Sequence, residues 1–197
     1  MTTSVPARQP LIVGIGGTTR QGSTSERILA KALEAAERLG ARTQLFNGPF
    51  LARLPIYDPA AADASPEAVA LLEGVQNADG VVIATPGYHG SVSGLIKNAL
   101  DTLEGTRASG RPYFQNLAVG CVVVADGWQA CGATLSALRD IIHALRGWPT
   151  PYGVTFNPSA GRLFADDGGL AEAKDAAQIE MMAGQVMDFV GRRSLAV

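Results

Sequence analysis

The sequence has only two cysteines, no long apolar run and no cluster of basic residues. Lys and Arg number 16 against 18 acidic residues, and this balance argues against nucleic acid as a partner. Because no apolar run approaches the roughly 18 residues of a membrane helix, we expect no membrane partner. Residues 1–10 lack the apolar core of a signal peptide, and two cysteines make a poor disulfide framework. We therefore expect a cytoplasmic protein with reduced thiols.

Several motifs of common enzyme classes are missing as well. A nucleophile elbow, G-x-S-x-G, would need serine at position 92, which is valine, so a hydrolase is not expected. His89 and His143 have no metal-ligand spacing, and no metal site is expected. The chain has no Gly-Lys-Ser/Thr triplet of a P-loop. A Rossmann G-x-G-x-x-G pattern fails at Thr19, and no acidic residue ends the second strand.

Apolar runs typical of buried parallel strands alternate with helical patterns along the chain. The expected strands are residues 11–15, 43–46, 81–84, 117–124 and 152–156, and the expected helices are 25–39, one opening at 65–67, 95–103, 135–145 and 170–190. This alternation predicts an α/β fold with a five-stranded parallel sheet of order 2-1-3-4-5 and helices on both faces. We expect one domain over residues 1–197, with residues 1–9 flexible.

Two unusual loops follow the first and third expected strands. In the 2-1-3-4-5 order, ligands bind beside the carboxyl ends of these two strands. Residues 16–25 contain glycines, hydroxyls and Arg20 just before a helix. Helix N-termini expose unpaired N–H groups and attract anions, and arginine adds a charge-assisted bond. Ser23 or Ser25 could serve only as an N-cap, but this explains neither Arg20 nor the location. The loop therefore predicts a phosphate site.

The loops after the third and fourth strands carry glycines beside aromatic residues. Residues 85–94 include Tyr88 and His89, and residues 125–132 include Trp128. A flat heteroaromatic ring is suited by backbone donors at its edge and aromatic surface on its face. Alone, Tyr88 reads equally well as a surface aromatic, and a lone histidine in a loop is more often structural than catalytic.

Two motifs carry a resemblance to a known family. Residues 17–25 read Gly-Thr-Thr-Arg-Gln-Gly-Ser-Thr-Ser, and residues 85–88 read Thr-Pro-Gly-Tyr, followed by Ser-Gly-Leu-Ile-Lys at 93–97 and by Asp101. The chain resembles the NAD(P)H-dependent FMN reductases of the flavodoxin-like superfamily, which include alkanesulfonate-linked, chromate, quinone and azo reductases. The loop at 54–58, Leu-Pro-Ile-Tyr-Asp, is similar to a family loop after the second strand.

The resemblance implies FMN as the flavin and NADPH or NADH as the hydride donor. Relatives often carry asparagine where this chain has His89, which leaves the contact at that flavin edge open. The residues implied to bind the cofactor are Thr18, Arg20, Ser23, Thr24 and Ser25 at the phosphate, Pro86, Gly87, Tyr88, His89, Gly90 and Ser91 along the isoalloxazine, and Asp126, Gly127 and Trp128 on its far side.

Hydride transfer between nicotinamide and flavin needs no protein acid or base, so we expect no catalytic side chain. The leading interpretation is an NAD(P)H-dependent FMN reductase. The alternatives are a reductase that retains FMN and acts on quinones, azo dyes or chromate, a flavodoxin-like electron carrier, and an interaction domain without flavin. Electron carriers usually have acidic docking surfaces, so the near-neutral net charge argues against a flavodoxin-like carrier. The resemblance also implies a homodimer or homotetramer, and a flavin-dependent monooxygenase is a candidate recipient of reduced FMN.

Overall fold

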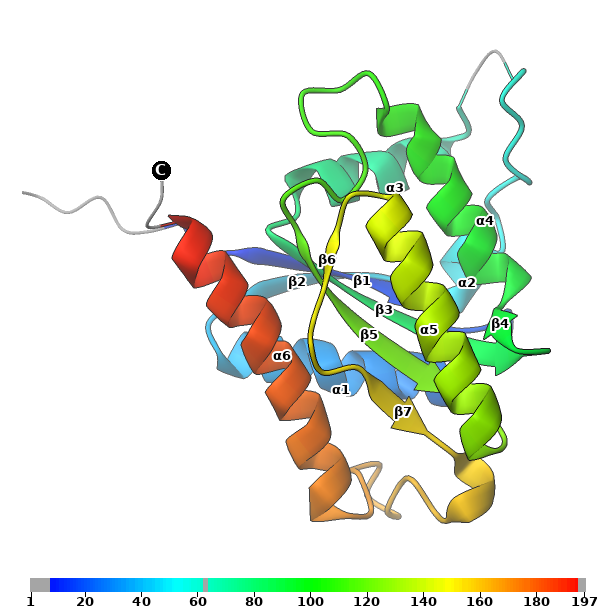
Figure 1. Ribbon diagram of the computed structural model, residues 1–197, viewed down its shortest axis with the longest axis vertical. Coiled ribbons are helices and arrows are strands. Elements are labelled where there is room, and N and C mark those ends of the chain that lie inside the picture. Colours follow the sequence, from blue (N-terminus) through cyan, green and yellow to red (C-terminus); the bar gives the residue numbers. More distant parts are fainter. Residues whose placement is uncertain (1–7, 62–63, 195–197) are drawn as a thin grey trace, which may run out of the picture.

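The computed structural model describes residues 8–61 and 64–194, and within them a central sheet has the strand order β2-β1-β3-β5-β6 (Figure 1). Its strands are β1 (Leu11–Gly16), β2 (Arg42–Phe46), β3 (Gly80–Tyr88), β4 (Ser91–Val92), β5 (Ala118–Val124), β6 (Trp148–Pro149) and β7 (Val154–Phe156). The helices are α1 (Thr24–Arg38), α2 (Gly48–Leu51), α3 (Pro66–Asn77), α4 (Gly94–Thr102), α5 (Trp128–Ala144) and α6 (Ala173–Ser194), with 3-10 turns at Leu103–Thr106 and Pro158–Ala160.

The predicted order 2-1-3-4-5 is confirmed for the parallel strands, but the sheet has 7 strands rather than five. The fifth expected strand, 152–156, is present as the shorter β7, and β6 is an additional two-residue strand before it; both pair with β5 in parallel. Pro149 and Pro151 lack the N–H that a continuous ladder requires, which accounts for the break between β6 and β7. The other added strand, β4, forms an antiparallel hairpin with the end of β3.

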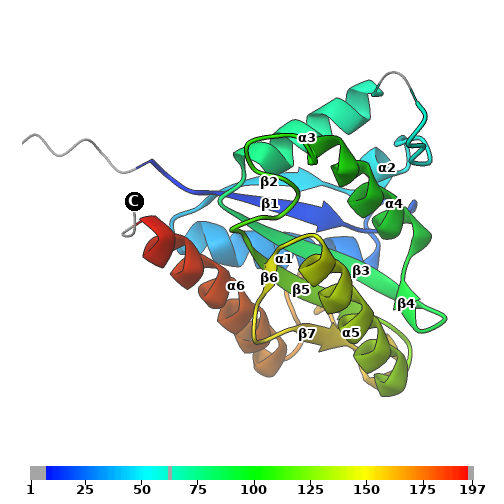
Figure 2. The same cartoon turned by 45° about the horizontal axis from the view of Figure 1, so that its top comes forward.

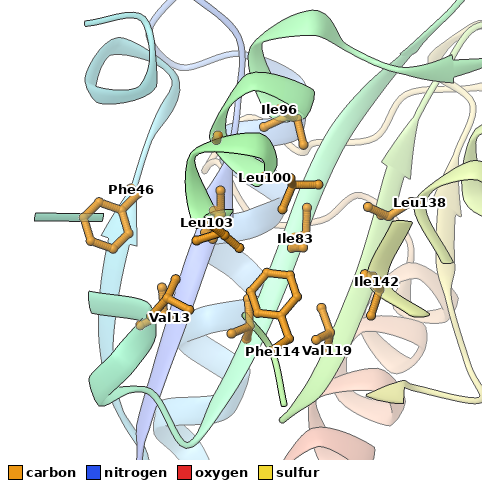
Figure 3. Close-up of a cluster of buried hydrophobic side chains, with 14 of the residues drawn as sticks. Val13, Phe46, Ile83, Ile96, Leu100, Leu103, Phe114, Val119, Leu138 and Ile142 are labelled. Carbon is orange, nitrogen blue, oxygen red and sulfur yellow. The ribbon is translucent and has the colours of Figure 1, made fainter. Parts of the chain in front are cut away.

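Helices cover both faces of the sheet, as expected (Figure 2). On one face α1 and α6 pack against side chains such as Ile12 and Val82. On the other face α3, α4 and α5 enclose a second apolar cluster, in which Phe114 is fully buried among Ile83, Leu103 and Val119 (Figure 3). Strands buried on both faces must be apolar throughout, and this is the pattern of β1, β5 and the first part of β3, residues 80–84.

Two helices begin at other residues than the sequence predicted. The prediction of a loop over 125–132 is wrong beyond Gly127, because α5 begins at Trp128 and not at residue 135. Gly127 has φ +95°, and its carbonyl accepts the first helical hydrogen bond from the Cys131 N–H. The last helix begins at Ala173 and not at residue 170, because Phe164 and Leu170 form a bridge before it.

Of the segment 1–9 that was expected to be flexible, residues 1–7 lie outside the described residues. Arg8 donates hydrogen bonds to the Asp79 carboxylate at 2.6 and 2.8 Å. Within the described residues, no helix is long and apolar enough to cross a membrane.

Candidate functional site

Three of the predicted site loops leave the sheet side by side. The register pairs Gly16 of β1 with Ala84 of β3, and Pro86 of β3 with Val124 of β5. The Gly17 N–H also donates to the Ala84 carbonyl at 3.4 Å. The loops after β1, β3 and β5 therefore begin at neighbouring points on the carboxyl edge of the sheet, where open α/β sheets bind ligands.

The loop between β1 and α1 is shaped by positive φ angles and short hydroxyl contacts. Gly17 and Gly22 have φ of +116° and +67°, and the Arg20 N–H donates to Thr18 Oγ1 at 3.2 Å. Ser23 is the N-cap of α1, and its Oγ accepts the Glu26 N–H at 3.4 Å. The N-cap interpretation is thus correct for Ser23, but a hydroxyl that accepts from the helix can still donate its proton to an anion.

Thr24 and Ser25, which were expected to lie in the loop, are the first two residues of α1. The Ser25 hydroxyl lies 3.4 Å from that of Ser23, and both residues are buried at the start of the helix. The first turn of a helix has N–H groups without intrahelical partners and a partial positive charge. Hydroxyl donors therefore converge where an anion is already favoured.

Arg20 supplies a cation at this helix start. Its side chain is exposed, and among the described residues none forms a hydrogen bond or ion pair with its guanidinium. An unpaired guanidinium next to helix N–H groups can form a bidentate pair with a phosphate without first breaking another pair. The arrangement of Arg20, Ser23 and Ser25 thus fits a phosphate group.

Glu26 places a carboxylate at the same helix start. Its Oε2 is buried without a hydrogen-bond partner among the described residues, and it lies 3.2 Å from the position of a Cβ added to Gly17. The spacing Ser23-x-x-Glu26 is that of a capping box, in which the glutamate returns to the N-cap N–H. Here Oε2 instead lies next to Gly17 with no partner among the described residues, so one negative group already stands near the candidate phosphate site.

The position of Thr18 depends on a glycine from another loop. A Cβ on Gly48, the first residue of α2, would lie 1.7 Å from the Thr18 carbonyl oxygen and 2.7 Å from its nitrogen. Asn47 is the N-cap of α2 and accepts the Phe50 N–H at 3.1 Å, which fixes the turn. Neither the short helix nor this contact was expected from the sequence, although Asn-Gly-Pro is a typical start of a helix.

The segment after β3 is a hairpin and not the flexible loop that the sequence suggested. β3 continues through Pro86 and Gly87 to Tyr88, which pairs with Ser91 of β4. The turn residues His89 and Gly90 have φ of +52° and +83°, as a tight two-residue hairpin requires. Tyr88, His89, Gly90 and Ser91 are exposed, and Pro86 is buried.

The hairpin is held against α5. The Thr134 hydroxyl donates to the Ser91 carbonyl at 3.4 Å, and a Cβ on Gly87 would lie 2.6 Å from the Thr134 Oγ1. The backbone of the hairpin therefore has little room to move toward α5. His89 has no side-chain partner among the described residues that would orient it as an acid or base.

The loop after β5 is fixed by residues that follow β7. The Gly127 N–H donates to Asn157 Oδ1 at 3.1 Å, and the Ser159 hydroxyl donates to Asp126 Oδ1 at 2.9 Å. Trp128, at the start of α5, is 62% exposed beside this loop. The sequence analysis did not single out Asn157, although its position just after the fifth expected strand was a usable signal.

The two cysteines are buried and free. Burial raises the pKa of Cys121 to about 12. Burial also raises the pKa of Cys131, whose thiol lies 3.4 Å from the Ala125 and Phe156 carbonyl oxygens. A thiol with a raised pKa is a poor nucleophile at neutral pH. Within the described part of the chain, no group of three or more His, Cys, Asp or Glu residues is arranged to hold a metal ion.

A family model described as NADPH-dependent FMN reductase matches residues 10–160 of the chain. The FMN-dependent NADPH-azoreductase of Staphylococcus haemolyticus is 34% identical over 121 residues, which is 60% of this chain and 60% of that protein. An iron-sulfur flavoprotein of Archaeoglobus fulgidus is 35% identical over 88 residues, which is 45% of this chain and 43% of that protein. The chain thus spans about half the length of these curated relatives.

Solved structures share the fold. FerB, an NAD(P)H:acceptor oxidoreductase of Paracoccus denitrificans, superposes with a TM-score of 0.71 at 22% identity, covering 93% of this chain and 98% of that one. At this level of identity the likeness concerns the fold alone, which is flavodoxin-like.

Proposed function

Since the chain belongs to the NADPH-dependent FMN reductase family, we propose that it transfers a hydride from NADPH or NADH to FMN. When bound, FMN supplies the redox chemistry by accepting the hydride and passing electrons on. The chain itself binds and orients the flavin and shields the transfer from water. The name of the staphylococcal relative, an FMN-dependent NADPH-azoreductase, supports this choice of flavin and donor.

The observation that carries the proposal is an exposed Arg20 guanidinium, paired with none of the described residues, in the same loop as the buried hydroxyls of Ser23 and Ser25. We expect these groups and Thr18 to hold the FMN phosphate, with Thr24 adding a first-turn N–H. We expect the ring system to lie between the hairpin residues 86–91 and the turn residues 126–128. The backbone N–H groups at such an edge would stabilise negative charge on the reduced ring, and no protein acid or base is needed.

Steady-state oxidation of NADH and NADPH by the purified protein, with added FMN, FAD or a quinone, tests this function. We expect rapid NAD(P)H oxidation that depends on FMN. A protein that oxidises neither nucleotide with any flavin would refute the proposal. A yellow protein that retains FMN through gel filtration and reduces quinones or azo dyes by ping-pong kinetics would favour the acceptor reductase, which the relative's name also supports.

Glu26 leads to a prediction about flavin affinity. A dianionic phosphate at the start of α1 would be repelled by the half-buried carboxylate of Glu26, whose Oε2 is shielded from solvent, and this repulsion is stronger than between two fully exposed charges. We expect Glu26→Gln to tighten FMN binding by about tenfold and to leave riboflavin binding unchanged. Quenching of flavin fluorescence measures both affinities.

Glu34→Gln is the matched control, because it removes the same charge from the same helix at a residue paired with Lys31 at 2.9 Å. We expect it to leave the preference for FMN over riboflavin unchanged. An equal loss of FMN and riboflavin affinity in Glu26→Gln would contradict the repulsion and assign Glu26 a contact with the sugar chain instead.

We further propose that residues 1–197 act as one FMN-binding domain in the cytoplasm and that the protein forms a homodimer or homotetramer. Ile56 and Trp128, 82% and 62% exposed, support a contact between copies. Tyr113 and Phe114, by contrast, are buried aromatic residues and offer little contact area. A flavin-dependent monooxygenase that receives the reduced FMN remains part of this proposal.

A further inference from the structure

A pocket of about 260 Å³ lies next to the turn after β5 and outside the predicted flavin-binding residues, with which it shares Trp128. Its walls come from β7, from the segment that follows it and from the first turns of α6. The principal lining residues are Trp128, Tyr152, Asn157, Leu163, Asp175 and Gln178. Pockets for drug-sized ligands measure about 300–1,000 Å³, so this one suits a single nucleoside and not a whole dinucleotide.

Asp175 is the unusual residue of this pocket. It is only 8% exposed, yet its carboxylate accepts no hydrogen bond from any described residue. Burial raises the pKa of its carboxyl group. Because the residue lines the pocket, what remains exposed of it faces this space. A carboxylate that is mostly enclosed by protein, lines the pocket and has no protein donor is available to accept a hydrogen bond from a ligand that brings an N–H group.

The residues that line the pocket limit the classes of ligand that it can bind. Trp128 and Tyr152 offer flat aromatic surface, and the Gln178 amide can both donate and accept. Quinones and azo groups carry only acceptors, so they cannot satisfy Asp175. A flat ring with an exocyclic amino group can do so, and adenine, which both nicotinamide dinucleotides contain, is such a ring.

We propose that this pocket binds the adenosine half of the nicotinamide dinucleotide, with the Asp175 carboxylate accepting a hydrogen bond from the exocyclic amine of adenine. The inference rests on the proposed function, because it takes NADPH or NADH as the hydride donor. It places the nucleotide on the β7 side of Trp128, whereas the flavin lies between Trp128 and the hairpin.

The test uses adenosine 5′-monophosphate as the probe and calorimetry as the readout. We expect the wild-type protein to bind this probe and to bind inosine 5′-monophosphate, which has a carbonyl in place of the amine, about tenfold more weakly. We expect Asp175→Asn to weaken binding of the adenosine probe by about tenfold and to raise the KM for the dinucleotide, with kcat and FMN affinity unchanged.

Asp188→Asn is the control, since it removes the same charge from an exposed position on the same helix. The proposal would be overturned if Asp175→Asn bound the adenosine probe as tightly as the wild-type protein does. If Asp175→Asn does not fold, the comparison of the two monophosphates on the wild-type protein still tests the proposal. Equal affinity for both, or no affinity for either, also overturns it. Failure of the proposed function is separate, and it would appear as a wild-type protein that oxidises no dinucleotide with FMN.

Discussion

Replacing Arg20 by alanine should weaken FMN binding by about 10- to 100-fold and leave riboflavin binding unchanged. Among the described residues the guanidinium pairs with none, so its full strength is available to a phosphate. A hydrogen bond to a charged group contributes about 1.5–3 kcal/mol, and each 1.4 kcal/mol is about tenfold in affinity. Quenching of flavin fluorescence on titration with protein gives both dissociation constants.

Two further variants make this result specific. Arg20→Lys keeps the charge but loses the planar fork, and we expect it to recover only part of the affinity. Arg38→Ala removes a cation from the far end of α1, where Arg38 pairs with Glu180 at 3.2 Å, and should change neither affinity. If Arg20→Ala retained the wild-type preference for FMN over riboflavin, the phosphate would not be bound by this loop.

The second large effect is expected from Gly48→Ala, which changes no group that could touch the flavin. The added Cβ would lie 1.7 Å from the Thr18 carbonyl oxygen, and the nearest atoms are all backbone atoms of Thr18, so no flexible side chain can move aside. Overpacking of this kind costs about 1–3 kcal/mol. We expect a lower free energy of unfolding in urea, together with at least tenfold weaker FMN binding as the loop is displaced.

Gly184→Ala in α6 is the matched control, because a Cβ there meets no atom within 4 Å. An alanine in a helix interior is about 1 kcal/mol more favourable than glycine, so this variant should be slightly stabilised and should bind FMN normally. Normal FMN affinity in Gly48→Ala would show that the contact with Thr18 does not position the phosphate loop.

The positions of the three central parallel strands could be predicted from the sequence because buried strands must be apolar on both faces, and their order followed from the alternation of strands with helices. The runs at 11–15, 81–84 and 117–124 carry that pattern without interruption, and the structure has strands there. The N-caps Ser65 and Ser93 are equally local signals, since the serine that caps a helix directly precedes it.

The features that the sequence did not indicate depend on contacts between distant segments. Gly127 is typical of a loop, and only its φ of +95° and the hydrogen bond that its carbonyl accepts from the Cys131 N–H show that α5 begins directly after it. The hairpin around His89 depends on the pairing of Tyr88 with Ser91. A two-residue strand such as β4 is too short to show an alternating pattern in the sequence. The contact of Gly48 with Thr18 and the burial of Asp175 likewise arise from packing between elements.

The central claim is that the loop between β1 and α1 holds the phosphate of FMN, and a crystal structure of the protein with FMN tests it most directly. We expect the phosphate oxygens within hydrogen-bond distance of the Arg20 guanidinium and of the Ser23 and Ser25 hydroxyls, with the ring beside the hairpin formed by β3 and β4. A phosphate bound elsewhere on the protein, with this loop unchanged and in contact with no part of the flavin, would contradict it.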